Sequence, residues 1–324
     1  MKGFMKNSRI NDIAKTAGVS VSTVSRVFNN RPYVKEELRK RVLEVAVDMD
    51  YTPKSMARRD TISIVISRPD DFVSNNYERS LVNRFFAAAS ELKLNLEFIP
   101  LDHIKRVYQN FSKAVIGMIY SEHAGDILRT VRNIPVLTVN YRTDGCSFVC
   151  TDHEAGVYRA TSYLLENGHR EIAILLAPYK ESMSWGECAR LDGYRKALEE
   201  HGIAFRRELV MYGGSEILNS SMKVLLHRHP TALIACGESL IMPLKYSLDL
   251  LNLKVPEDIS LITFYSPEIT PFLLPEQTCI RQDFDQLARI AMEKVCALIE
   301  EEETDVGILL PNEFIEGNSV SRLN

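Results

Sequence analysis

Apolar residues recur at helical spacing near the start of the chain. Ile10, Ile13, Ala14 and Ala17 fall at positions i, i+3, i+4 and i+7, which lie on one face of a short helix. Gly18 follows them, and glycine readily takes the left-handed backbone conformation that ends a helix. The pattern therefore predicts a short helix that stops at Gly18.

A second helix is predicted directly after this turn. Ser20 stands where the side chain of an N-cap residue accepts a hydrogen bond from a free backbone amide. The apolar positions that follow are Val24, Val27 and Phe28, and the outward positions are Val21, Ser22 and Arg26. Two short helices crossed over a glycine turn form a helix-turn-helix, whose second helix enters the major groove of DNA.

A third helix and a short connector complete this N-terminal head. Val34, Leu38, Val42 and Met49 keep the helical spacing. Residues 51–58 are basic and carry no apolar stripe, so we expect a connector that does not fold independently.

The pattern of apolar and polar residues changes after residue 61. Short apolar runs typical of buried strands occur at 62–67, 94–99, 114–120, 135–140, 171–177, 209–212, 232–236 and 259–264. Amphipathic helices are indicated around 81–89, 127–131, 154–166, 189–201, 218–228, 240–251 and 279–303. This alternation predicts parallel sheets covered on both faces, arranged in two similar α/β halves.

Charge is divided unevenly along the chain. The formal net charge of the 324 residues is −4, but residues 1–60 hold 13 Lys or Arg against 7 Asp or Glu, and the remainder holds 26 against 36. A head of +6 on a body of −10 is typical of a DNA-binding module joined to a different kind of domain. The length predicts two or three cores, and the lack of any apolar run of transmembrane length predicts a soluble intracellular protein.

Motifs that carry chemistry are sparse. The six cysteines include no Cys-x-x-Cys pair and sit among apolar neighbours, so we expect free thiols, no metal site and no cofactor. The sequence also lacks the Gly-x-Gly-x-x-Gly, Walker, Gly-x-Ser-x-Gly and His-Glu-x-x-His motifs. His153 beside Asp152 is the pairing that would suit acid–base work. We predict that the chain is not an enzyme.

Five further motifs follow the helix-turn-helix in order. They are Tyr51-x-Pro53 with Ala57-Arg58, Asp152-His-x-x-Gly156, Tyr163-Leu-x-x-x-Gly168-His169-Arg-x-Ile172, Pro230-Thr-Ala-Leu-Ile-Ala-Cys236 and Val255-Pro-Glu-Asp-Ile-Ser-Leu-Ile262. Over roughly residues 8–320 the chain resembles the LacI/GalR family of bacterial transcriptional regulators. The resemblance implies an α/β protein with an all-α helix-turn-helix head. Its body would be periplasmic-binding-protein-like, with two Rossmann-like subdomains and parallel sheets that enclose a ligand between strand ends.

The resemblance also implies a division of the chain. Residues 1–60 would be the DNA-binding head with its hinge at about 51–60, and residues 61–324 the effector-binding and dimerisation domain. Subdomain 1 would hold about 61–149 and 279–305, and subdomain 2 about 150–278 and 306–324. Dimer contacts would come from the surface near 78–92, with Leu81, Phe85 and Phe86 as candidates.

Candidate DNA contacts follow from the outward face of the second helix, which matches the base-reading positions of the family. Arg26 can donate two hydrogen bonds to guanine O6 and N7, Val21 can touch a thymine methyl group, and Ser22 is a permissive partner. Phosphate contacts suit Ser20, Thr23, Ser25, Asn29 and Tyr51. In the hinge the candidates are Lys54, Ala57 and Arg58.

The hinge departs from the family pattern at Asp60. Related proteins carry a leucine there, which wedges into the minor groove and kinks the operator. A carboxylate cannot insert between base pairs without a large desolvation cost. Either Met56 or another residue makes the kink, or this operator is bent less.

An effector would lie at the carboxyl ends of the strands, between the two halves. Arg190 matches the family's ligand-binding arginine, and further cleft candidates are Tyr77, Tyr120, Asn140, Tyr141 and Trp185. Ser239 and Tyr265 stand where sugar-binding members have carboxylates, and Glu238 is one position away from the first of them. The two losses favour an anionic sugar derivative over an ordinary hexose.

These features predict a repressor that binds a palindromic operator as a homodimer under the control of a sugar or sugar derivative. It would act in the bacterial cytoplasm, on the nucleoid when bound to DNA. The alternative is a binding protein of the same fold without gene control or, least favoured, an enzyme on a Rossmann-like scaffold.

Overall fold

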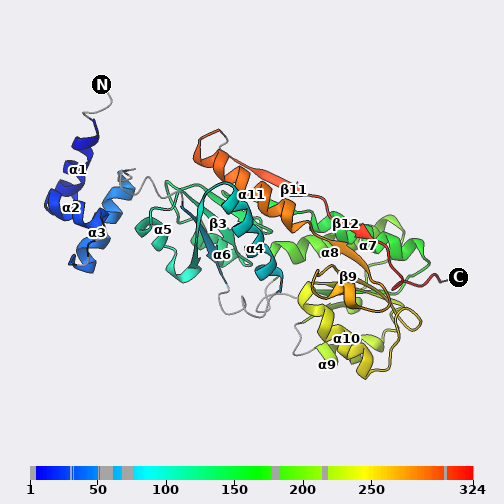
Figure 1. Ribbon diagram of the computed structural model, residues 1–324. Coiled ribbons are helices and arrows are strands. Elements are labelled where there is room, and N and C mark those ends of the chain that lie inside the picture. Colours follow the sequence, from blue (N-terminus) through cyan, green and yellow to red (C-terminus); the bar gives the residue numbers. More distant parts are fainter. Residues whose placement is uncertain are drawn as a thin grey trace.

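In a computed structural model the chain forms a helical head followed by two α/β halves (Figure 1). The structure describes residues 5–29, 31, 33–49, 51, 61–67, 76–176, 183–213, 218–302 and 305–323. Figure 1 shows the head beside the first half, and the second half at the far end of the molecule.

The head consists of α1 (Met5–Thr16), α2 (Val21–Phe28) and α3 (Glu36–Asp48). Gly18 takes the left-handed conformation, with φ of 66°, and Ser20 caps α2 by accepting a hydrogen bond from the Thr23 amide at 3.1 Å. Ile13, Val24, Val27, Phe28 and Val42 are among the side chains that fill its core. The predicted helix-turn-helix is confirmed, including its turn and its cap.

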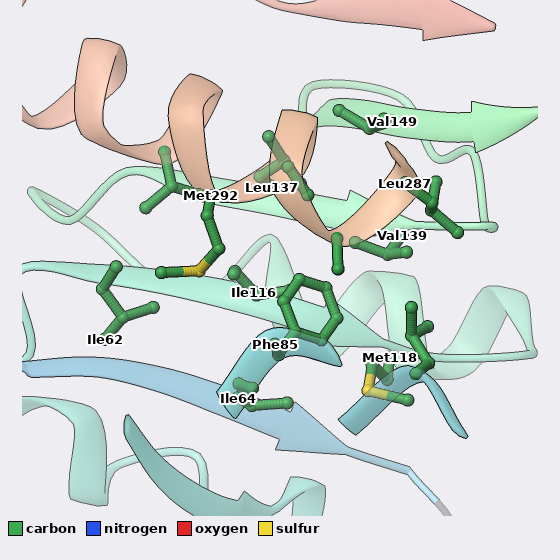
Figure 2. Close-up of a cluster of buried hydrophobic side chains, with 14 of the residues drawn as sticks. Ile62, Ile64, Phe85, Ile116, Met118, Leu137, Val139, Val149, Leu287 and Met292 are labelled. Atoms are coloured by element: carbon green, nitrogen blue, oxygen red, sulfur yellow. The ribbon is translucent and has the colours of Figure 1, made fainter. Parts of the chain in front are cut away.

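The first half is built on a parallel sheet whose strand order is β11-β5-β4-β3-β1-β2. Its strands are β1 (Thr61–Ile66), β2 (Asn95–Pro100), β3 (Ala114–Met118), β4 (Val136–Val139), β5 (Ser147–Thr151) and β11 (Gly307–Leu310). Helices α4 (Asn76–Glu91) and α11 (Phe284–Ile299) pack on one face (Figure 2). The short helices α5 (Arg106–Gln109) and α6 (Glu122–Leu128) cover the other.

The second half repeats this plan with the strand order β12-β10-β9-β8-β6-β7. Its strands are β6 (Ile172–Leu176), β7 (Val210–Tyr212), β8 (Ala232–Cys236), β9 (Ser260–Phe264), β10 (Thr278–Arg281) and β12 (Glu313–Ile315), of which β12 alone runs antiparallel to its partner. Helices α7 (His153–Glu166) and α8 (Trp185–Glu200) cover one face, and α9 (Leu218–Leu226) and α10 (Ile241–Leu250) the other.

Two expected boundaries differ from the sheets that form. Residues 279–281 were expected to begin a helix of the first half, but they belong to β10 of the second sheet, and α11 starts at Phe284 with Asp283 as its cap. Residues 307–310, expected in the second half, form β11 of the first sheet. Such strands are too short to show a period of their own, so only their pairing decides the sheet to which they belong.

Candidate nucleic-acid interface and ligand cleft

The outward face of α2 is available for contact. Val21 is 45% exposed although it is apolar, and Ser22, Ser25 and Arg26 are exposed on the same short helix. Asn29 ends the helix, where its amide Nδ2 donates to the Ser25 carbonyl at 2.8 Å. Val21, at the start of α2, presents an apolar contact to base edges, and Arg26, in the last turn of the helix, presents a bidentate donor.

Of the other predicted DNA contacts, Ser20 is exposed, Thr23 and Tyr51 are half-buried, and the rest lie outside the described residues. The hydroxyl of Ser20 is within 2.8 Å of both the Ser22 and the Thr23 hydroxyls. Tyr51 is half-buried, with its ring stacked on Phe28 at 5.6 Å between centroids. Residues Lys54, Ala57 and Arg58, together with Met56 and Asp60, lie outside the described part of the chain.

A cleft of about 130 Å³ opens between the halves at the carboxyl ends of the strands. Asn140 directly follows β4, Cys236 ends β8, Phe264 ends β9 and Gln282 directly follows β10. The rest of its wall consists of Tyr77, Tyr120, His153, Ser184, Gly186, Glu187, Arg190, Gly237, Glu238 and Ser239. Parallel strands bring these side chains together because their carboxyl ends meet at one edge of each sheet.

Asn140 organises the floor of the cleft. Its backbone is left-handed, with φ of 50°, and its Oδ1 accepts from the Thr151 amide at 2.7 Å. Its Nδ2 donates to the Tyr77 hydroxyl at 2.8 Å and to Gln282 Oε1 at 3.1 Å. This network joins strand ends of both halves, since Gln282 follows β10 of the second sheet. Burial raises the pKa of Tyr77, so its hydroxyl stays protonated.

Arg190 reaches the cleft from α8. Its Nη1 lies 3.3 Å from Glu187 Oε1, and its guanidinium sits 4.8 Å from the centre of the Phe264 ring. Glu187 is itself fixed, because it forms a capping box with Ser184 at the start of α8. The Nε of Arg190 is buried and has no hydrogen-bond partner among the described residues. Arg190 is thus held in place with one donor unused.

Glu238 supplies a carboxyl group to the same wall. It is 6% exposed, and neither carboxyl oxygen has a hydrogen-bond partner in the described part of the chain. Burial and the nearby Glu268 carboxylate raise the pKa of Glu238 to about 8, against the opposing influence of Arg190 and Arg84. The cleft therefore combines an unused cationic donor with an unused acidic acceptor.

Three residues expected in the cleft do not line it. Tyr141 follows the left-handed Asn140 and turns into the core on the α5–α6 face of the first sheet. Trp185 begins α8 and packs on His153, at 5.7 Å between ring centres, and against the same core. Tyr265 faces a neighbouring cavity beside Arg281, because side chains alternate along the chain after Phe264.

Several wall residues were not singled out as effector contacts from the sequence. His153 is buried, and burial together with Arg190 lowers its pKa well below the usual value, so its ring is neutral. Ser184 and Glu187 form a capping-box pattern that signals a helix start but not a ligand site. Gln282 follows a strand that the sequence pattern did not reveal.

The described residues hold neither a cluster of metal ligands nor a membrane-spanning helix. They contain no group of three or more His, Cys, Asp or Glu side chains placed to hold a metal ion. None of the helices among them is both long and apolar enough to cross a membrane.

Comparison with known proteins matches both parts of the chain. Residues 9–54 match the profile of bacterial regulatory proteins of the lacI family, and residues 161–320 match that of a periplasmic binding protein-like domain. The probable HTH-type transcriptional repressor ExuR of Bacillus subtilis (strain 168) is 28% identical over 335 residues, covering 97% of this chain and 98% of the relative.

Solved structures agree with the fold. A complex of the transcriptional regulator CelR with cellobiose has a TM-score of 0.73 and 23% identity, over 96% of this chain and 99% of that one. The lac repressor dimer bound to operator and the anti-inducer ONPF has a TM-score of 0.68 and 20% identity, over 96% and 98%. The predicted architecture is confirmed, and the curated relative is a repressor and not an enzyme.

Proposed function

Because the chain belongs to the LacI/GalR family of bacterial transcriptional regulators, we propose that it binds a palindromic operator as a homodimer and that a small molecule in the cleft sets its operator affinity. It is a DNA-binding transcriptional repressor with a ligand-binding body, not an enzyme. One observation carries the proposal: the helix-turn-helix has a packed hydrophobic core, while Val21 and Arg26 of α2 remain exposed. Its place of action is the cytoplasm, where the bacterial chromosome lies.

The DNA contacts rest on α2. Arg26 reads a guanine through its two parallel donors, and Val21 contacts a thymine methyl group. Ser20, Ser22, Thr23, Ser25, Asn29 and Tyr51 supply hydroxyls and an amide for phosphates or base edges, and Lys54, Ala57 and Arg58 extend the contact through the hinge. Operator bending remains smaller than in relatives that carry the leucine wedge, since Asp60 replaces it.

The effector is a small polyhydroxylated compound of the sugar class. Glu238 accepts hydrogen bonds from ligand hydroxyls, and Arg190 Nε donates to a ligand oxygen, so that both unused groups find partners. Arg190 is already paired with Glu187, and Glu238 keeps its proton up to about pH 8, so these groups leave no net positive charge for an anionic ligand. This balance favours a neutral sugar derivative over the anionic one that the two lost carboxylates favoured.

Exposed apolar side chains on the second half offer a surface for dimerisation. Met242, Tyr246 and Leu250 are exposed at four-residue spacing on α10, and Phe272 and Leu274 are exposed in the loop before β10. On α4 only Phe86 of the three candidates is exposed, at 68%, because Leu81 and Phe85 are buried in the core of the first half (Figure 2). A homodimer would place two recognition helices on the two halves of a palindrome.

The ligand half of the proposal is tested with the single tryptophan of the chain. Trp185 belongs to the second half and packs against core residues of the first, so closure of the cleft changes its surroundings. Titration of the full chain with neutral sugars, sugar phosphates and sugar acids should change Trp185 fluorescence for one class. The same ligand should leave the fluorescence of Arg190→Ala unchanged; a normal response of that variant would show that the ligand binds elsewhere.

A further inference from the structure

The head is in direct contact with the first half at the end of α3. Asn133 Nδ2 donates to the Val47 carbonyl at 2.9 Å, and the Phe111 ring packs against the core of the head. Phe111 meets Phe28 edge to face, with 5.9 Å between ring centres. A body residue thus completes the head's hydrophobic core, and another satisfies a carbonyl in the last turn of its third helix.

Both body residues have a left-handed backbone, which phenylalanine rarely adopts and asparagine adopts more readily than other residues except glycine. Phe111 has φ of 53° and Asn133 has φ of 59°. Phe111 lies one residue beyond the C-cap of α5, where glycine is the usual residue, and a bulky side chain in this conformation is strained. The surrounding structure must hold it there, and the ring packs against the core of the head.

The two loops that carry these residues are tied to each other. The Tyr108 hydroxyl accepts a hydrogen bond from the Arg132 amide at 2.7 Å. The strands that follow them are β3, which runs from the junction toward Tyr120, and β4, which lies between Pro135 and Asn140. Pro135 lines a cavity between head and body, and Asn140 and Tyr120 line the ligand cleft. Two adjacent strands therefore reach from the head contact to the cleft.

We propose that Phe111 and Asn133 form a docking platform that seats the DNA-binding head on its own first half and orients the recognition helix. The platform leaves Val21 and Arg26 exposed, so docking does not block the DNA-reading face. The head is then positioned by the body as well as by its connector. A change at the strand ends in the cleft has a packed route to the head through β3 and β4.

Substitution of Phe111 by glycine distinguishes the contribution of its ring from that of its backbone conformation. Phe111→Gly suits the left-handed conformation and removes only the contact with the head, so the first half should keep its stability. Lys93→Gly is the matched control, because Lys93 also has φ of 57° and lies in the turn after α4. Asn133→Gly is a second variant that removes the hydrogen bond to Val47 in the same way.

Hydrogen exchange in the full chain without DNA or ligand tests the platform. Phe111→Gly and Asn133→Gly should raise exchange of the amides of α2 and α3 by about tenfold, while Lys93→Gly leaves them unchanged. Unchanged exchange in both platform variants would overturn the proposal. Because no DNA is present, unchanged exchange would contradict the docking platform but not the proposed binding of the operator. Operator affinity, measured separately, should fall by about tenfold in Phe111→Gly, since a free head has lost its orientation.

Discussion

At the residue scale, two ionisable side chains of the cleft, Arg190 and Glu238, have different environments. Arg190 is ion-paired and stacked on a ring, whereas the Glu238 carboxyl is buried with no hydrogen-bond partner among the described residues. Family motifs pointed to Arg190 on α8, Tyr77 on α4 and Asn140 after β4, and all three line the wall. They misplaced Tyr141, because a left-handed residue before it redirects the side chain, and a motif does not encode that φ.

The raised pKa of Glu238 predicts a pH-dependent stability. The folded chain keeps the proton up to about pH 8, whereas the unfolded chain releases it near the ordinary value of 4.5. The free energy of unfolding should therefore decrease as the pH rises from 4.5 to 8, by roughly 5 kcal/mol at most, and level off above. Glu238→Gln should lose this part of the slope in urea unfolding between pH 5 and pH 8. An unchanged slope would mean that Glu238 is ionised in the native state.

Arg26 is expected to carry base selection. Arg26→Ala should weaken operator binding by about 10–100-fold and relax the preference for guanine at one position of each half-site, since a bidentate contact is worth roughly 1–3 kcal/mol. Ser25→Ala, on the same helix, should weaken binding evenly across sequences, because phosphate contacts do not specify bases. Selection of bound fragments from a random DNA pool measures both. Retained guanine preference in Arg26→Ala would assign the reading to another residue.

At the element scale, the long helices and eight of the strands were predictable, whereas β5, β10, β11 and β12 were not. Runs such as 232–236 carry a continuous apolar signal, but β10, β11 and β12 have three or four residues each and only their partners define them. Close contact between helices also leaves little trace in the sequence. Gly193 of α8 lies so near α7 that an added Cβ would be 2.2 Å from the Glu154 carbonyl oxygen.

We therefore predict that a single methyl group added at Gly193 strongly lowers the stability of the chain. Gly193→Ala should separate α7 from α8 and lower the free energy of unfolding of the chain by about 1–3 kcal/mol or more. At Gly202, an added Cβ would meet nothing within 4 Å, so Gly202→Ala reports only the cost of its φ of 69°. Thermal unfolding should show the larger decrease in Gly193→Ala. Equal decreases would place the cost in the backbone and not in the contact between the helices.

At the scale of the whole molecule, the chain crosses repeatedly between two halves and leaves an apolar surface open on each. The family resemblance predicted the crossings but misplaced two of them, because the strands at the crossings show no pattern. Leu250 on α10 and Phe86 on α4 are both exposed, which suits an interface that involves both halves. The closure of the cleft and the spacing of two heads would then be linked through one dimer.

Charge placed on this surface should separate the subunits. Tyr246→Glu or Leu250→Glu should convert a dimer into a monomer of 36.8 kDa in sedimentation velocity, because a charge cannot be buried unpaired in an apolar interface. Phe98→Glu, which changes another exposed aromatic residue on β2, should leave the dimer intact. A dimer that persists in both α10 variants would show that the interface lies on another face.

The central claim is that a ligand in the cleft controls the affinity of the head for DNA. The most direct measurement is the operator dissociation constant of the wild type and of Arg190→Ala, by fluorescence anisotropy, with and without the ligand found by Trp185 fluorescence. The account predicts equal affinities without ligand, a change of about tenfold or more in the wild type with ligand, and no change in Arg190→Ala. An equal ligand effect on both proteins would contradict it.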